Sequence, residues 1–451
     1  MKRKLKITGC LLLCLVLGAC SGKEEAEEAS KEVTEIQLSD EQSSIALNFV
    51  KDLTQRKYEK LQTDYTYDEQ MGAAVQKDDF QKQLDGYNDS LGALVEAEQP
   101  YGQSYQGSVI IMIPCRMEEQ NTNIQLSLNE KNEIQGLFFK PYKSQKKSAQ
   151  APEGVQETDV DLKISDGKKL SGKLTTPDQK GKFPLVILLA GSGPNDMDET
   201  IYDNKPFQDI AWGLAEKGIA SYRYDKRTYT YPESFTLKDT VEQEVIEDAL
   251  SAVKLMKQEQ QINTKQIYIL GHSLSGYLIP RIASKTSDCA GYIMMAAPAR
   301  PLDEILIEQV EYLANLDDSV SKEKQASIDQ YKQDQRDLQQ INDLSDAKMF
   351  FGGMSKAYMK DLLSYDPVKQ AADIKVPVLC AQGLRDYQVT EEDHKLWKET
   401  FKDQENWTFT TYPNATHLMI DGKGKPTNEE YKTKGHVNQT FIKDIASFII
   451  K

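Results

Sequence analysis

The hexapeptide GHSLSG, residues 271–276, contains the residue types from which a nucleophilic hydroxyl can be built. It comes close to the pattern G-x-S-x-G, which places a reactive serine on a sharp turn between a strand and a helix. The preceding QIYIL has the composition of a buried strand, and the following SGYLIPRIAS can begin a helix. In that setting Ser273 would present its hydroxyl above the sheet, because Gly271 leaves room for the strained turn.

One position departs from this pattern. Ser275 stands where the second glycine is expected, and Gly276 follows it. Ser275 is itself an alternative nucleophile, but the residue two positions before it is not glycine. A third interpretation is an ordinary strand-to-helix turn that contains serines by chance. The strand before the turn and the helix after it favour Ser273 as the nucleophile.

A nucleophilic serine needs a general base, because its hydroxyl ionises far too weakly on its own. The chain has four histidines. His417, in YPNATHLM, follows the predicted strand WTFTTYP and is the predicted base. His436, before the last predicted helix, is the alternative. His272 would face away from the Ser273 hydroxyl, and His394 lies in the charged helix EEDHKLWKETF, where we expect it to be solvated.

The base in turn needs a carboxylate that fixes its tautomer and stabilises the imidazolium. Asp386 is the predicted partner, because it follows the apolar run VPVLCAQG and precedes His417 in the chain. Asp373 lies before that strand and Asp393 on the helix after it, so both are weaker candidates. The competing interpretation of Asp386 is an aspartate of a surface turn.

Developing negative charge on a substrate oxygen requires backbone N–H donors, each worth about 3 kcal/mol. The residue after the nucleophile, Leu274, is one predicted donor. The other is Ser192 or Gly193, in the glycine-rich segment GSGPND that follows the apolar run FPLVILLA.

The elements that must position these residues alternate between strand and helix from residue 156 to 451. Short apolar runs such as FPLVILLAG, IASYRYD, KQIYILGHS, AGYIMMAAP and VPVLCAQG are separated by amphipathic helical segments. DLKISDGKKLSGKLTTP is predicted to form a hairpin. This rhythm predicts an α/β domain with a doubly wound, mostly parallel sheet.

The alternation is interrupted between residues 299 and 365. LDEILIEQVEYLANL and SIDQYKQDQRDLQQIND have helical periodicity with no strand between them. An insertion at that point is predicted to form a helical cap over the carboxyl edge of the sheet, where caps shape substrate pockets. The alternative is a surface decoration.

A smaller domain is predicted for residues 41–143. Ile45, Phe49 and Leu53 recur at helical spacing, and the runs SVIIMIPCRM, TNIQLSL and EIQGLFFKPY predict strands, the last two joined by the turn NEKNE. Helices followed by a strand meander indicate an α+β domain. Its pattern resembles, loosely, the cystatin-like or nuclear-transport-factor-like domains that precede some secreted hydrolases. Residues 144–155, KSQKKSAQAPEG, are predicted to be a polar linker.

The N-terminus has the features of a bacterial lipoprotein signal. A basic start, MKRKLK, precedes an apolar run that is too short to span a bilayer, and the segment ends in LGAC. We therefore expect residues 1–19 to be a signal peptide and Cys20 to be lipidated; a plain secretory signal is the alternative. The acidic residues 20–40 would follow as a tether. The mature chain would then be extracytoplasmic and anchored to the membrane.

Composition excludes several other classes of function. A formal charge of -15 opposes binding to nucleic acid. Cys115, Cys289 and Cys380 are scattered, which predicts buried apolar thiols rather than a disulfide framework or a metal site. No nucleotide-binding fingerprint, P-loop or zinc-helix motif occurs, so no cofactor and no metal is implied. The D-x-D pair Asp196 and Asp198 is better explained as a loop brace for Arg223, Arg227 or Arg385.

Taken together, AGSGP, YRYDKR, GHSLSG, AAPARPLDEI, YDP, GLRDYQV and YPNATH resemble the α/β-hydrolase superfamily. The set is most similar to bacterial secreted carboxylesterases that carry a small N-terminal domain. The resemblance implies a catalytic triad of Ser273, Asp386 and His417. Two positions depart from the family pattern: Ser275, and Ala190, where a histidine often precedes the oxyanion glycine.

The expected function is therefore a lipid-anchored serine hydrolase that cleaves small, uncharged acyl esters through an acyl-enzyme. A thioesterase or peptidase of the same fold is the nearest alternative. A non-catalytic binding protein on a hydrolase scaffold is the alternative from another class.

Overall fold

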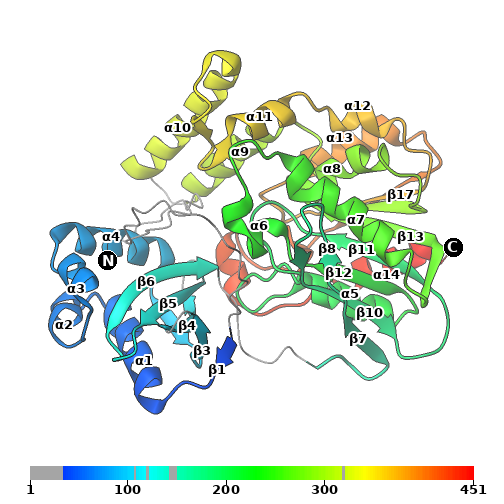
Figure 1. Ribbon diagram of the computed structural model, residues 1–451. Helices are drawn as coiled ribbons and strands as arrows, with labels where there is room; N and C mark the ends of the chain where they lie inside the picture. The colour runs from blue at the N-terminus through cyan, green and yellow to red at the C-terminus, as the bar shows by residue number, and fades with distance from the viewer. Residues whose placement is uncertain (1–33, 106–107, 118–120, 142–149, 317–319, 451) are drawn as a thin grey trace. The chain divides into compact units, whose positions relative to one another are not determined.

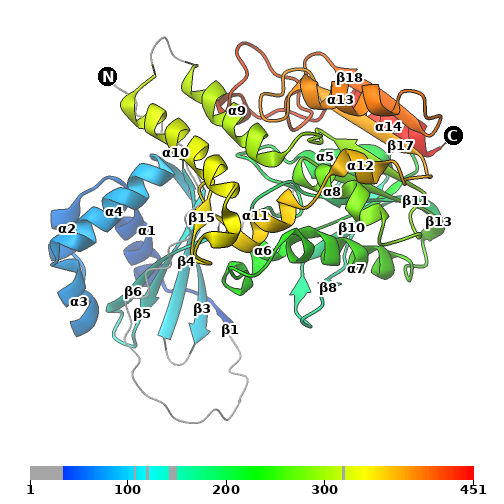
Figure 2. The ribbon, with the colours of Figure 1, turned by 90° about the horizontal axis from the view of Figure 1, so that it is seen from above.

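The chain divides into two compact units, residues 1–149 and 150–451, and the division falls inside the predicted linker. The computed structural model describes residues 34–105, 108–117, 121–141, 150–316 and 320–450 (Figures 1 and 2). The predicted signal peptide, Cys20 and most of the predicted tether lie outside the described residues, as do residues 144–149, half of the predicted linker.

The first unit combines four helices with an antiparallel sheet. The sheet has the order β1-β3-β4-β5-β6, and β2 pairs with β4. Its strands are β1 (Thr34–Ile36), β2 (Leu94–Ala97), β3 (Tyr101–Tyr105), β4 (Ser108–Met117), β5 (Thr122–Leu128) and β6 (Ile134–Pro141). Its helices are α1 (Asp40–Thr54), α2 (Tyr58–Thr63), α3 (Glu69–Val75) and α4 (Asp78–Leu91).

The last three strands lie where the sequence predicts them. The turn between β5 and β6 is closed by Asn132 in the left-handed region, at φ 60°. The start of this unit differs from the prediction, because Thr34–Ile36 pair with β3 although they lie in the predicted tether. Helix α1 begins with a capping box between Ser39 and Gln42 and buries Phe49 and Leu53 in the core of the unit.

The second unit is built on an eight-stranded, mostly parallel sheet with the order β18-β17-β14-β13-β11-β12-β10-β7. Six neighbouring strands from β18 to β12 are parallel, and β10 is antiparallel to both β12 and β7. The strands are β7 (Val155–Asp159), β10 (Gly172–Pro177), β11 (Phe183–Leu189), β12 (Ala220–Tyr224), β13 (Ile262–His272), β14 (Gly291–Met295), β17 (Val378–Gly383) and β18 (Trp407–Tyr412).

The predicted hairpin at residues 161–177 is divided between two sheets. Strands β8 (Leu162–Lys163) and β9 (Lys169–Leu170) form a separate two-stranded ribbon. Strand β10 instead joins the large sheet by pairing with β12 and β7, and Gly172 lies so close to Tyr222 of β12 that a side chain there would meet its hydroxyl.

Helices cover both faces of this sheet, as buried parallel strands require. Alternate residues of β11 enter two different cores: Val186 and Leu188 pack with α5 (Pro206–Ala215) and α14 (Gln439–Ile449). Leu185 and Ile187 pack on the other face with α7 (Glu247–Met256), α8 (Leu274–Ala283) and α13 (Glu391–Phe401). A π-helical turn, Glu242–Ile246, leads into α7.

The insertion between β14 and β17 contains the two long helices that its periodicity predicts. Helices α9 (Leu302–Ala314) and α10 (Lys322–Leu338) lie side by side (Figure 2). The insertion also contains the ribbon of β15 (Met349–Phe350) and β16 (Met354–Ser355), which was not predicted, followed by α11 (Lys356–Leu363). Helix α12 (Pro367–Ala371) then leads to β17. The short helix α6 (Arg227–Thr230) follows β12.

Cys115, Cys289 and Cys380 are all buried and unpaired, in or beside strands, as predicted. Within the described residues, no helix combines the length and the apolar character needed to span a membrane.

Candidate active site

Ser273 lies on a strained turn between β13 and α8. Its backbone has φ 52° and ψ -117°, a conformation that a residue other than glycine rarely adopts. Gly271 makes the turn feasible, because a Cβ there would lie 2.5 Å from the carbonyl oxygen of Ser275. The Ser273 N–H donates to the carbonyl of Met295 at 2.9 Å, which ties the turn to the neighbouring strand β14.

The glycine displaced from the usual pattern is needed where it stands. A Cβ on Gly276 would lie 2.8 Å from the Cβ of Ala297, so the close approach of helix and strand falls at residue 276. Ser275 is fully buried, and its hydroxyl donates to the carbonyl of Ala190 at 2.5 Å. Ser275 therefore has a structural partner of its own, and its hydroxyl is not available as a nucleophile in this arrangement.

Asp386 and His417 come together as the sequence predicts. The Nδ1 atom of His417 lies 2.6 Å from Oδ2 of Asp386. The carboxylate also accepts from Nε2 of Gln382 and from the N–H groups of Gln388 and Val389. Both side chains are buried, so the hydrogen bonds fix the carboxylate and leave the Nε2 atom of His417 as the nitrogen that can accept a proton.

Close packing of two loops makes this contact feasible. Asp386 follows β17 and His417 follows β18, the neighbouring parallel strand. Gly383 ends β17, and a Cβ there would lie 2.4 Å from the carbonyl oxygen of Ala415. The Arg385 N–H donates to that same carbonyl at 3.0 Å. The two loops are therefore held against each other along their main chains.

The glycine-rich loop after β11 is braced from one side. The side-chain amide of Asn195 lies 3.2, 3.0 and 3.4 Å from the carbonyl oxygens of Gly191, Ser192 and Gly193. The ammonium group of Lys226 also donates to the Gly191 carbonyl, at 2.6 Å. The Gly191 N–H donates to Glu199 and is therefore not available to a substrate oxygen. Ser192 and Gly193 remain the predicted oxyanion donors of this loop.

Leu274 is the first residue of α8, where the helix leaves N–H groups without intrahelical acceptors. The structure thus places one predicted donor at the start of this helix and the others in the loop after β11, the strand beside β13.

His394 and His436 have other surroundings, and the prediction about His394 is wrong. His394 was expected to be solvated but is only 4% exposed. It lies on the inner face of α13 with Asp393, Trp397 and Phe401, while the other charged residues of that helix are exposed. His436 is exposed and pairs with Asp209 at 3.1 Å, away from Asp386.

The two competing aspartates have other positions. Asp393 accepts from the N–H groups of Ala299 and Arg300 and pairs with the Arg300 guanidinium at 2.9 Å, so it anchors the start of the cap insertion. Asp373 is exposed at the surface.

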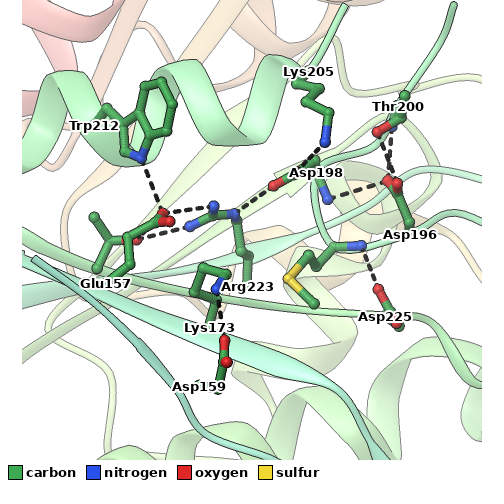
Figure 3. A network of polar contacts seen from close by, with 12 residues as sticks. Glu157, Asp159, Lys173, Asp196, Asp198, Thr200, Lys205, Trp212, Arg223 and Asp225 are labelled. Carbon is green, nitrogen blue, oxygen red and sulfur yellow. Dashed lines mark hydrogen bonds and ion pairs between the residues drawn. The ribbon is translucent and has the colours of Figure 1, made fainter. Parts of the chain in front are cut away.

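The D-x-D pair braces a loop, as predicted, and its cationic partner is Arg223. Arg223 is fully buried and lies between Asp198, at 2.7 Å, and Glu157, at 2.8 Å (Figure 3). Asp196 accepts from the N–H and the hydroxyl of Thr200. Arg227 and Arg385 pair instead with Asp248 and Glu430.

Glu199, Asn195 and Lys226 also belong to the site, although their roles were not predicted. Asn195 and Lys226 brace the loop after β11, and Glu199 contacts both that loop and His272. The only signal for Asn195 and Glu199 was their position in the segment GSGPNDMDET, which contains many residues able to form side-chain to main-chain bonds, and Lys226 lies in the separate segment YRYDKR.

The cap insertion contacts the loops of the site. Gln309 of α9 donates to the carbonyl of Gln388, two residues after Asp386, at 2.8 Å. Tyr312 stacks on Tyr387, with ring centroids 5.1 Å apart. On another side, the hydroxyl of Tyr358 in α11 donates to Glu244, which pairs with Lys226. The insertion therefore packs against the carboxyl edge of the sheet.

Two family models match parts of the chain. The family model described as serine aminopeptidase, S33, matches residues 204–423, which include Ser273, Asp386 and His417. A family described as a protein of unknown function, DUF3887, matches residues 46–137 in the first unit.

Esterase EstD of Thermotoga maritima is 39% identical over 328 residues, which cover 72% of this chain and 76% of that protein. Among solved structures, the Pyrococcus furiosus esterase Pf2001 is 19% identical, with a TM-score of 0.42 over 65% of this chain and 90% of that one. Est1E from Butyrivibrio proteoclasticus is 18% identical, with a TM-score of 0.42 over 65% and 99%. On the strength of the match to EstD, the chain belongs to the α/β-hydrolase superfamily, in the esterase family that includes that enzyme.

Proposed function

We propose that the protein is a serine carboxylesterase in which Ser273 is the nucleophile, His417 the general base and Asp386 its orienting carboxylate. One observation carries this proposal: the buried Asp386–His417 hydrogen bond lies at the same sheet edge as the strained turn of Ser273. A buried aspartate bound to the imidazole fixes the tautomer that accepts a proton from a hydroxyl.

The reaction proceeds in two halves. The Ser273 hydroxyl attacks the ester carbonyl while Nε2 of His417 takes its proton, and the oxyanion receives hydrogen bonds from the N–H groups of Leu274 and of Ser192 or Gly193. The intermediate collapses with release of the alcohol, which leaves with that proton. Water then attacks the acyl-enzyme, again giving its proton to His417, and the acid departs as Ser273 is restored.

The substrates we propose are esters of uncharged acyl groups. The chain carries a formal charge of -15, which disfavours the approach of anionic substrates. The cap insertion contacts the Asp386 loop through Gln309 and Tyr312, so its helices are placed to limit the acyl and alcohol groups that enter.

Turnover of p-nitrophenyl esters tests the proposal. The full-length protein in mild detergent should hydrolyse the acetate and butyrate, and a series of acyl lengths would define the pocket. Ser273→Ala should remove turnover without loss of the folded state. Ser284→Ala, at the other end of α8, is the matched control and should keep wild-type rates. Undiminished hydrolysis by Ser273→Ala would rule out the proposed nucleophile.

A peptidase activity is the second candidate, because the matching family is described as serine aminopeptidase. The same triad would then cleave an amide, with an amine as the leaving group. Alanine p-nitroanilide, assayed beside the esters, distinguishes the two. Hydrolysis of the anilide at rates above those of the esters would favour the peptidase.

We also propose that the mature protein is extracytoplasmic, on the cell surface or the periplasmic side, and anchored to the membrane through a lipid on Cys20. The basic start, the short apolar run and LGAC support this. Cells fed labelled palmitate should incorporate label into the wild-type protein in the membrane fraction and not into Cys20→Ala. Label retained by that variant would exclude Cys20 as the modified residue.

A further inference from the structure

His272, the residue before the proposed nucleophile, is buried between two acceptors. Its Nδ1 atom lies 2.8 Å from Oε1 of Glu199, and its Nε2 atom lies 3.0 Å from the backbone carbonyl oxygen of His417. The side chain is 2% exposed, and Glu199 is 6% exposed. Neither ring nitrogen therefore has water as its main partner.

The two contacts restrict where the protons lie. A backbone carbonyl has no hydrogen to donate, so Nε2 must carry a proton to form its bond with His417. On the other side, Oε1 of Glu199 already accepts from the Gly191 N–H at 2.7 Å. An ionised carboxylate accepts only, so Nδ1 must donate as well. With Glu199 ionised, both ring nitrogens carry hydrogen and the ring is an imidazolium.

We propose that His272 is an imidazolium paired with the Glu199 carboxylate, and that this pair positions the oxyanion loop relative to the loop of the general base. Through Glu199 the pair holds the main chain at Gly191, and through Nε2 it holds the main chain at His417. The role rests on the proposed esterase function, whereas the protonation of His272 does not.

The loop that contains Glu199 is fixed in a way that supports this role. Glu199 has φ 53°, a conformation that costs energy for any residue with a side chain, so surrounding contacts must hold it. Asp198, its neighbour, is paired with the buried Arg223 and with Lys205 (Figure 3). Asp196 and Asp225 accept main-chain N–H groups from the same loop. The network thus directs one carboxylate to Gly191 and His272.

The charges around His272 agree with an ion pair. Burial by itself would lower the pKa of His272, but the Glu199 carboxylate and its hydrogen bond outweigh burial, so the pKa is raised. The same pairing, with the Gly191 N–H, holds the pKa of Glu199 below its ordinary value despite burial. Asp386, which is bonded to Nδ1 of His417, adds negative charge, and the His417 ring centroid lies 4.6 Å from that of His272.

Nitrogen NMR tests the protonation directly. With ¹⁵N-labelled histidine, the full-length protein gives side-chain signals from four residues, which single His→Gln variants assign. We expect both nitrogens of His272 to carry hydrogen at pH 7 and above, beyond the range where an ordinary histidine is charged. A neutral ring at pH 7, with one nitrogen bare, would overturn the proposal. This result stands whether or not the protein turns over an ester.

Kinetics of Glu199→Gln test the positioning role. The variant should lose kcat on the order of 10- to 100-fold, because the two loops are no longer held in register. Its rate should also decline at a lower pH on the alkaline side than that of the wild type, since His272 has lost its carboxylate. If Glu199→Gln is folded and active and its rate declines at the same alkaline pH as that of the wild type, the positioning role of the pair is contradicted.

The matched control is His394→Gln, which removes another buried histidine from the same unit, one whose ring packs against Phe409 of β18. It should leave kcat and the alkaline limb unchanged. If the wild type shows no ester turnover and no fluorophosphonate labelling, the proposed function fails, and the NMR experiment still decides the state of His272.

Discussion

The hydroxyl of Ser275 donates a hydrogen bond to the backbone carbonyl of Ala190. These are the two positions at which the sequence departs from the family pattern, and they are in contact. Ser275 lies in the first turn of α8, and Ala190 begins the loop that carries the proposed oxyanion donors. A glycine at 275 would leave that carbonyl without this donor. The serine therefore links the nucleophile turn to the oxyanion loop.

Removing this hydroxyl should lower stability. Ser275→Ala leaves the buried carbonyl of Ala190 without its donor, at about 1–3 kcal/mol in the free energy of unfolding. Ser275→Gly restores the usual motif but adds about 1 kcal/mol for glycine in a helix. Urea unfolding followed by circular dichroism measures both. A Ser275→Gly variant more stable than the wild type would show that the hydrogen bond contributes nothing.

Asp386→Asn tests the orientation of the base. The asparagine oxygen can still accept from the N–H groups of Gln388 and Val389, so the fold should persist. Its amide would face His417 Nδ1 with hydrogens and favour the wrong tautomer, and kcat should fall by about 10⁴. Steady-state ester hydrolysis checks the rate, and the melting temperature checks the fold. A loss smaller than about tenfold would argue against Asp386 as the orienting group.

The contributions of His272 and His394 to the free energy of unfolding should depend on pH in opposite directions. The raised pKa of His272 supplies stability that is complete below about pH 6.5 and is lost as pH rises through the folded value. Burial lowers the pKa of His394, so its contribution is present above about pH 6.5 and is lost as pH falls through the folded value.

The measurement is the free energy of unfolding against pH for the wild type, His272→Gln and His394→Gln. The stability difference between wild type and His272→Gln should shrink toward alkaline pH. The difference for His394→Gln should shrink toward acid pH. Parallel curves for all three proteins would contradict the protonation states assigned to both rings.

Substitution of Arg223 should lower the free energy of unfolding more than substitution at most other positions in the second unit. Arg223→Met leaves the carboxylates of Asp198 and Glu157 without their buried partner. The free energy of unfolding should fall by about 3–5 kcal/mol. Arg223→Lys should recover little, because a compact ammonium cannot reach both carboxylates as the planar guanidinium does.

Lys173→Met is the control, since its partner Asp159 is exposed and the pair should contribute about 0–1 kcal/mol. Thermal melting of the three variants compares them. An Arg223→Met protein as stable as Lys173→Met would show that the network does not hold the loop.

The sequence predicted those parts of the site that follow from strand ends. Ser273, Asp386 and His417 each lie within five residues of the end of a predicted strand, and parallel strands bring such positions to one edge. Glu199 has no comparable signal, because its role depends on a positive φ and on contacts with residues distant in the chain. The departure at Ser275 was visible, but its partner Ala190 lies on another strand, so the hydrogen bond was not.

His394 shows how a local pattern was misinterpreted. The charges of EEDHKLWKETF suggested a solvated helix, yet Asp393, His394, Trp397 and Phe401 recur at helical spacing and form its buried face. The helix itself was predicted, and its orientation followed from the apolar residues rather than from the charges. The predicted end of the tether was wrong for a different reason. Thr34–Ile36 form a strand only by pairing with β3, which is distant in the sequence.

The most direct test of the account is the site of covalent labelling. The full-length protein is treated with a fluorophosphonate, digested, and mapped by mass spectrometry. We predict one adduct per chain, on the hydroxyl of Ser273, and none in Ser273→Ala, while Ser275→Ala remains labelled. An adduct on Ser275, or labelling of Ser273→Ala equal to that of the wild type, would contradict the assignment of Ser273 as the nucleophile.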